Sequence, residues 1–310
     1  MKSTSSAGRV INKGRARLKL RTRLRAFAHP APAHPANGAL PTLDAAGPVE
    51  SLPARRTAPG SWTIAPGTGF IDQHPRFLDT STTAATRSRL NLRHEAIITD
   101  NKDVLEGARV LDIASHDARW TYAALRAGAS HVTGAEGRPE LVAHAEENLQ
   151  HYGVDPDRYR FIVGDIFTTL DKERPQADVV LCLGFLYHTM RYDDVFHVMS
   201  QSNAEFLILD TQVEPSREAI LRVRTNGVVG QGSAFTDSPI HTGQVLVGRP
   251  SVRALRTMAW VYGYRLDRFS DWSGILEDNP PGRTVKVYRA GARATLRFKR
   301  DPSLGTPPEE

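Results

Sequence analysis

Residues 107–118 read Gly-Ala-Arg-Val-Leu-Asp-Ile-Ala-Ser-His-Asp-Ala, and this stretch decides the fold. The apolar run over 109–114, which contains Asp112, is typical of a buried strand, and the turn after it opens a helix. In doubly wound α/β domains, an acid at the end of the first strand and the turn that follows hold an adenosine-bearing ligand. The turn lacks the three glycines of the dinucleotide fingerprint, so later segments have to identify the ligand.

Strand-like and helical segments alternate along the rest of the chain. Short apolar runs predict strands at 109–114, 131–135, 160–163, 179–183, 206–210, 265–269 and 284–288. Helical spacing or capping signals predict helices at 90–104, 120–127, 140–151, 167–171, 194–200, 217–223 and 251–260. This order predicts an α/β fold: a doubly wound, Rossmann-like, seven-stranded, mostly parallel sheet with helices on both faces.

Composition divides the chain into a leader, a domain and a tail. Residues 1–56 are rich in Pro and Ala and basic, so we expect a disordered leader; a transit peptide and translated flanking sequence are the alternatives. The α/β domain is predicted over 70–293, with a lid inserted at 211–243, where glycines interrupt a polar stretch. Residues 294–310 are predicted to form a loose tail.

Charge and cysteine content limit the classes of function. The whole chain carries +6, and the leader holds eleven Lys and Arg against two acids, so the remainder carries −3 and lacks a basic footprint for nucleic acid. The single Cys182 excludes an intramolecular disulfide and a cysteine-rich metal site, and we expect no metal. No apolar run suits a membrane span or a secretory signal, so a cytoplasmic location is predicted.

Three acids follow successive predicted strands. Asp112, Glu136 and Asp165 each lie at or just after the carboxyl end of a strand, and these ends meet at the edge where open α/β sheets bind ligands. The two oxygens of Glu136 suit a ribose diol, and Asp165 suits an adenine amine, with Ile166 as apolar surface. Any one of them alone would be interpreted as a surface or capping acid, and the functional interpretation rests on the three together.

A fourth segment, Gly184-Phe185-Leu186-Tyr187-His188, follows the fourth predicted strand. The order of the four segments resembles class I S-adenosylmethionine-dependent methyltransferases over about 109–213. Residues 184–188 are similar to the Gly-Val-Leu-Tyr-His stretch of the wobble-uridine carboxymethyltransferases and their small-molecule relatives. The resemblance implies that S-adenosyl-L-methionine is the cofactor and that its contacts are Asp112, Ala114, Ser115, His116, Glu136, Asp165, Ile166, Leu183 and Gly184.

The chain departs from the family in the turn. Where these enzymes have Asp-x-Gly-x-Gly-x-Gly, this sequence has Ala114, His116 and Ala118 at the glycine positions. A residue other than glycine costs about 1–2 kcal/mol if its position requires a positive φ. His116 is therefore either strained or used to contact the ligand, and the sequence leaves both open.

His188 is the candidate general base, needed only if the acceptor arrives protonated, and a structural histidine is the alternative. We expect methyl transfer to a small-molecule or lipid-like acceptor. The alternatives are modification of a tRNA or other RNA base and a non-catalytic cofactor-binding protein. A nicotinamide-binding domain is disfavoured by the missing glycines.

Overall fold

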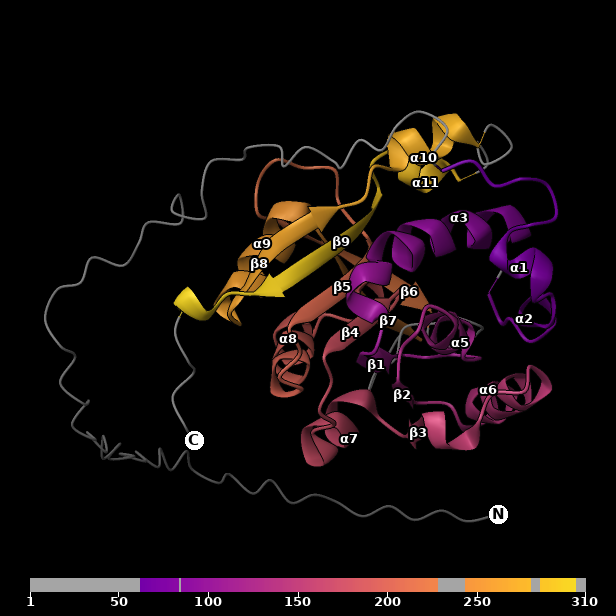
Figure 1. The fold of residues 1–310 in the computed structure, drawn as a ribbon. Helices are drawn as coiled ribbons and strands as arrows, with labels where there is room; N and C mark the ends of the chain where they lie inside the picture. The colour runs from indigo at the N-terminus through magenta and orange to yellow at the C-terminus, as the bar shows by residue number, and fades with distance from the viewer. Residues whose placement is uncertain (1–61, 84, 228–242, 280–284, 305–310) are drawn as a thin grey trace, which may run out of the picture. The chain divides into compact units, whose positions relative to one another are not determined.

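The computed structural model describes residues 62–83, 85–227, 243–279 and 285–304, and a seven-stranded sheet lies at its centre (Figure 1). The strand order is β3-β2-β1-β4-β5-β9-β8, and β1 to β5 run parallel while β9 is antiparallel to both its neighbours. The predicted fold class is confirmed. The strands of this sheet are β1 (Arg109–Ile113), β2 (His131–Glu136), β3 (Tyr159–Val163), β4 (Val179–Leu183), β5 (Phe206–Gln212), β8 (Tyr264–Phe269) and β9 (Arg293–Arg300).

Helices connect the strands, and most predicted helices lie within two residues of the observed ones. The predicted helix over 90–104 is instead divided, because α3 ends at Ile97 and a 3-10 turn follows. The α-helices are α1 (Phe70–Gln73), α2 (Arg76–Asp79), α3 (Arg87–Ile97), α4 (Lys102–Leu105), α5 (Arg119–Arg126), α6 (Pro139–His151), α7 (Ile166–Glu173), α8 (Tyr192–Gln201), α9 (Val252–Val261), α10 (Trp272–Asp278) and α11 (Lys286–Arg289). The 3-10 helices are η2 (Thr99–Asn101), η3 (Pro156–Arg158), η4 (Leu186–His188) and η6 (Pro302–Leu304).

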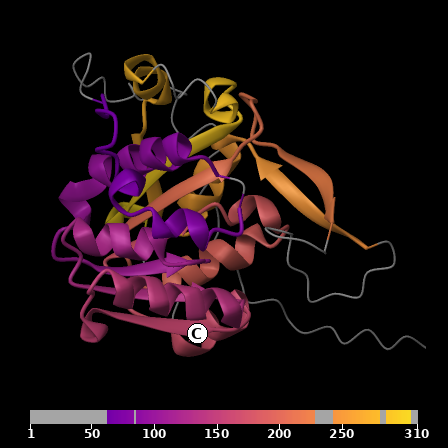
Figure 2. The ribbon, with the colours of Figure 1, turned by 90° about the vertical axis from the view of Figure 1, so that its right-hand side faces the viewer.

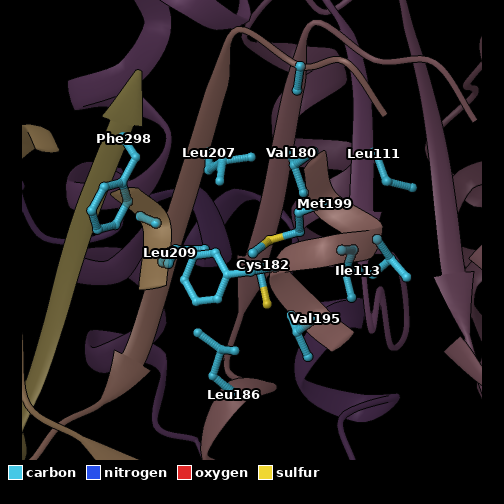
Figure 3. Close-up of a cluster of buried hydrophobic side chains, with 14 of the residues drawn as sticks. Leu111, Ile113, Val180, Cys182, Leu186, Val195, Met199, Leu207, Leu209 and Phe298 are labelled. Atoms are coloured by element: carbon cyan, nitrogen blue, oxygen red, sulfur yellow. The ribbon is translucent and has the colours of Figure 1, made fainter. Parts of the chain in front are cut away.

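Alternate side chains of the central strands pack on opposite faces, because successive residues of a strand point to opposite sides. On one face, side chains such as Leu111, Val180 and Leu207 pack with α7, α8 and α9 (Figure 3). On the other, Val110, Leu181 and their neighbours pack with α1 to α6. Helices therefore cover both faces, which explains why these strands are apolar along their whole length.

The predicted loose tail over 294–310 is wrong for residues 294–300. These residues belong to β9, which pairs with β5 on one side and β8 on the other, and Ala294, Leu296 and Phe298 are buried. The predicted strand at 284–288 is also wrong, since Lys286 begins the short helix α11 and the described chain enters β9 only at Arg293. The domain therefore extends beyond 293.

Residues 221–227 form a strand, so the predicted helix over 217–223 is wrong. Strand β6 (Leu221–Gly227) pairs with β7 (Gln244–Pro250) in an antiparallel ribbon separate from the main sheet (Figure 2). The ribbon is anchored at the start of α8, where the Tyr192 hydroxyl donates to the Gly248 carbonyl at 2.7 Å. Part of the predicted lid, residues 228–242, and the predicted leader lie outside the described residues.

The described chain begins before the predicted boundary at 70. Trp62 is buried with Trp272, Ile275 and Tyr288, and the Asn279 side chain donates to the Trp62 carbonyl at 2.8 Å. Within the described ranges, no helix is both long and apolar enough to cross a membrane.

Candidate active site

The turn after β1 adopts left-handed backbone conformations at the three positions where the family has glycine. The φ angles are +58° at Ala114, +55° at His116 and +64° at Ala118. Residues with a side chain are strained in this conformation. The positive φ that the sequence analysis named as the condition for strain is therefore present at all three positions. Neighbouring Gly134 allows the turn to approach β2, because a Cβ on it would lie 2.9 Å from Ser115 Oγ.

His116 is held in this conformation by its side chain. Its Nε2 lies 2.6 Å from Thr82 Oγ1, and its Nδ1 lies 3.2 Å from Asp117 Oδ1. Asp117 is fully buried and accepts from Arg119 Nε at 2.8 Å and Nη2 at 2.7 Å. Burial alone would raise the pKa of Asp117, but Arg119 and His116 outweigh it and hold that pKa well below its usual range. These contacts offset the strain with a local ion-pair network.

Asp112 and Glu136 lie together on neighbouring strands. Asp112 pairs in register with Gly134, two residues before Glu136, and both acids are buried. Burial raises the pKa of Asp112 to about 7, although the Thr121 hydroxyl donates to Asp112 at 2.8 Å. Glu136 Oε2 accepts from the His116 backbone N–H at 3.0 Å, so Glu136 is bonded directly to the strained turn.

Asp165 follows β3 at the same edge and caps α7. Its Oδ1 accepts from the Thr168 backbone N–H at 2.9 Å and from the Thr168 hydroxyl at 2.8 Å. Ile166, the first residue of α7, is buried. The structure thus brings Asp112, Glu136 and Asp165 to one sheet edge, and it gives Asp165 the capping role that the sequence left open.

Strand β4 ends at Leu183, and Gly184 turns the chain with a φ of +100°. The 3-10 turn that follows places Tyr187 and His188 at this edge, with ring centroids 4.2 Å apart. Burial, together with Arg293 and Arg138, lowers the pKa of His188 to about 4. His188 is therefore neutral near pH 7, and its buried Nδ1 has no hydrogen-bond partner in the described part of the chain.

A buried network at the end of β5 was missed by the sequence analysis. Asp210 Oδ1 accepts from Arg93 Nη2 and Arg293 Nε, both at 2.8 Å, and Oδ2 accepts from the Tyr288 hydroxyl at 2.5 Å and the Thr295 hydroxyl at 2.7 Å. The rule that selected Asp112 and Glu136 could have found Asp210, because Asp210 also lies near the carboxyl end of a parallel strand. Its partners come from α3, α11 and β9.

The described residues hold no cluster of three or more His, Cys, Asp or Glu side chains arranged for a metal ion. Cys182 lies in the core beside Leu209 and Leu186 (Figure 3). Burial raises the pKa of its thiol to about 12, so this thiol is inert near neutral pH.

Comparison with known proteins agrees with this geometry. Residues 110–204 match a family model described as a methyltransferase domain. No curated protein sequence matches the chain. The matched residues run from β1 past α8 and include Asp112, Glu136, Asp165 and His188.

Solved structures with a similar fold are distant in sequence. One is an S-adenosylmethionine-dependent methyltransferase from Mesorhizobium loti, at 13% identity and a TM-score of 0.45, covering 64% of this chain and 93% of that one. Another is magnesium protoporphyrin IX methyltransferase from Synechocystis with SAH bound, at 15% identity and a TM-score of 0.46, covering 73% and 94%. At these identities the likeness concerns the fold alone.

The family match and the acids at the sheet edge support an S-adenosylmethionine-dependent methyltransferase, and S-adenosyl-L-methionine is the cofactor that the match implies. The predicted superfamily is confirmed in this general form. The narrower resemblance to the wobble-uridine carboxymethyltransferases stays a prediction, as do the roles of the individual site residues.

Proposed function

We propose that this protein transfers a methyl group from S-adenosylmethionine to a small-molecule acceptor at the carboxyl edge of β1, β2 and β4. The observation that carries the proposal is the position of two buried acidic side chains, Asp112 and Glu136, beside a turn with three left-handed residues. In the described chain the buried Ser115 Oγ in this turn, which lies against Gly134 of β2, has no hydrogen-bond partner.

Each residue has a proposed role that its chemistry allows. Glu136 receives the ribose hydroxyls, since each carboxylate oxygen accepts more than one hydrogen bond. Asp112 and the turn 114–116 face the methionine moiety, Asp165 and Ile166 face the adenine, and Leu183 and Gly184 line the sulfonium region. The cofactor, when bound, supplies an electrophilic methyl group, and the protein accelerates transfer by aligning the acceptor and excluding water.

His188 is proposed to take the proton of an acceptor that must lose one. It lies past the end of β4, beyond the residues assigned to the nucleoside, and it is unprotonated near neutral pH. Its lowered pKa makes it a weak base, so it suits an acceptor whose proton becomes acidic as the methyl group transfers.

The test is calorimetric titration of the full chain with SAH and, separately, with NAD. We expect SAH to bind and NAD not to bind. Glu136→Gln should weaken SAH binding by about tenfold or more, because a bond to a charged acceptor is lost. Glu140→Gln, the same change at an exposed position of α6, should leave affinity unchanged. Equal affinities of the two variants would remove Glu136 from the site.

Small molecules are favoured over RNA because residues 57–310 are acidic overall. An RNA base remains the alternative acceptor. Labelled methyl transfer to bulk tRNA, compared with transfer to a metabolite extract, separates the two.

A further inference from the structure

Three arginines gather next to the proposed methyl-transfer position, and we call them the arginine cluster: Arg89, Arg93 and Arg293. Arg89 and Arg93 lie one turn apart on α3, so they share a face of that helix. Arg293 opens β9, and its Nη2 lies 3.5 Å from the place where a Cβ on Gly184 would be. Its guanidinium carbon is 5.3 Å from the centre of the Tyr187 ring.

The cluster holds more positive charge than the acids in the described part of the chain balance. Asp210 bonds to Arg93 and Arg293, and these arginines outweigh the effect of burial and keep the pKa of Asp210 well below its usual range. Tyr288, which also bonds to Asp210, stays neutral because burial raises its pKa. Among the residues that the structure describes, three guanidinium groups therefore face one carboxylate, and two positive charges remain.

Several donors of this cluster also lack an acceptor. Buried nitrogen atoms without a hydrogen-bond partner in the described part of the chain are Arg89 Nε, Arg93 Nε and Arg293 Nη1. The side chains of Arg93 and Arg293 are 9% and 1% exposed, so water does not readily replace the missing acceptors. Buried charged donors without partners are costly, and native proteins rarely retain them without a ligand or a role.

We propose that the methyl acceptor is an anion, and that the arginine cluster binds its carboxylate or phosphate group. This inference rests on the proposed function, because the position of Gly184 beside the sulfonium makes the bound oxyanion part of the acceptor. An oxyanion supplies the missing charge and the missing acceptor atoms together, and planar guanidinium groups bind both carboxylate and phosphate through paired hydrogen bonds.

Burial is the main cause of the lowered pKa of His188, and the position of the cluster adds to it. Arg293 is one of the groups that lower the pKa of His188, so a positive field surrounds the proposed base. The cluster holds the anion, and His188 stays free to take a proton from another part of the same acceptor. Arg293 is thus a specificity residue for the acceptor, and Arg89 supports it.

The experiment titrates two simple probes, benzoate and phenyl phosphate, into the full chain with and without SAH. Benzamide is the neutral control. The variants are Arg89→Met, which removes a side chain without hydrogen bonds in the described structure, and Arg293→Gln. The matched control is Arg87→Met, which removes a charge from the same helix at an exposed residue paired with Asp72.

We expect at least one of the two anions to bind and benzamide not to bind. The anion that binds more tightly shows whether the cluster prefers a carboxylate or a phosphate group. Arg89→Met should weaken the anion about tenfold or more, whereas Arg87→Met should not. If Arg293→Gln does not fold, Arg89→Met still decides the question. Absence of anion binding, equal binding of benzamide, or equal losses in Arg87→Met and Arg89→Met would overturn the proposal.

The two proposals fail separately. SAH titrated alone tests the proposed function, and a folded wild-type chain that binds the anion but not SAH contradicts methyl transfer while leaving an anion site. If the chain binds SAH but neither anion, the proposed methyltransferase function is retained and the proposal of an anionic acceptor is refuted.

Discussion

Replacing Ala114 by glycine measures the strain stored in the turn after β1. Ala114 has a φ of +58°, where a residue with a Cβ costs about 1–2 kcal/mol and glycine costs nothing. The substitution also removes a half-buried methyl group and gives the unfolded chain more freedom, and both effects lower stability. The net change in the free energy of unfolding is therefore small.

A matched alanine isolates the strain. Ala127 is also half-buried but has an ordinary φ of −78° at the end of α5, so Ala127→Gly suffers the same two losses without relieving strain. Ala114→Gly should be more stable than Ala127→Gly by about 1–2 kcal/mol, the strain itself. Urea unfolding of the three proteins, followed by circular dichroism, gives this difference.

Equal stabilities of the two variants would refute the reasoning, because they would show that the turn holds Ala114 without strain. SAH titration of Ala114→Gly provides a second check. If the left-handed conformation is the one that binds the cofactor, affinity should stay the same or increase, since glycine adopts it freely.

Three further predictions concern buried titratable groups. Folded Asp112 keeps its proton up to about pH 7, whereas in the unfolded chain this residue loses its proton near pH 3.8. The free energy of unfolding of the wild type should therefore fall as pH rises between these values. Urea unfolding at several pH values should show that Asp112→Asn lacks this dependence. His188→Ala should lower kcat about 10²–10⁴-fold with little change in SAH affinity, and wild-type kcat/KM should fall only below about pH 4; unchanged turnover means a structural histidine. Asp210→Asn should destabilise the fold by about 3–5 kcal/mol in urea, because Arg93 and Arg293 lose their counter-charge; a loss under 1 kcal/mol means the network is replaceable.

The parallel half of the sheet was predictable because its strands are buried on both faces. Segments such as 179–183 are apolar throughout, and no other element of that length and composition fits between two helices. The short apolar runs therefore located β1 to β5 within a few residues. The acids of the site followed, since in this topology the carboxyl end of each strand lies at one edge.

Strand β9 was missed because its signal is mixed with charge. Its sequence alternates Ala294, Leu296 and Phe298 with polar residues, but Arg293 and Arg297 made the segment look like a solvated tail. Their partners lie far away in sequence, with Asp210 83 residues before Arg293, and local pattern cannot show such pairing. The arginine cluster was hidden for the same reason.

The ribbon was missed for a different reason. Ile220 and Val223 are three residues apart, which suits a helix, whereas Leu221 and Val223 are two apart, which suits a strand. The choice depends on pairing with β7, which lies beyond residues 228–242. The sequence predicted strain in the turn after β1 only on the condition that its positions require a positive φ. Its φ values depend on contacts of His116 with Thr82 and Asp117, which only the folded chain brings together.

The insertion of β9 between β5 and β8 has a consequence for how the protein is made. The carboxylate of Asp210 accepts hydrogen bonds from Arg93, 117 residues earlier in the sequence, and from Arg293, 83 residues later. During synthesis the proposed cofactor edge on β1, β2 and β4 can assemble first, while the proposed acceptor end has to wait until residues 293–300 have been translated. Until then β5 presents an unpaired edge and Asp210 lacks Arg293, so the nascent chain at this stage is open to strand-edge aggregation and is a natural client for a chaperone.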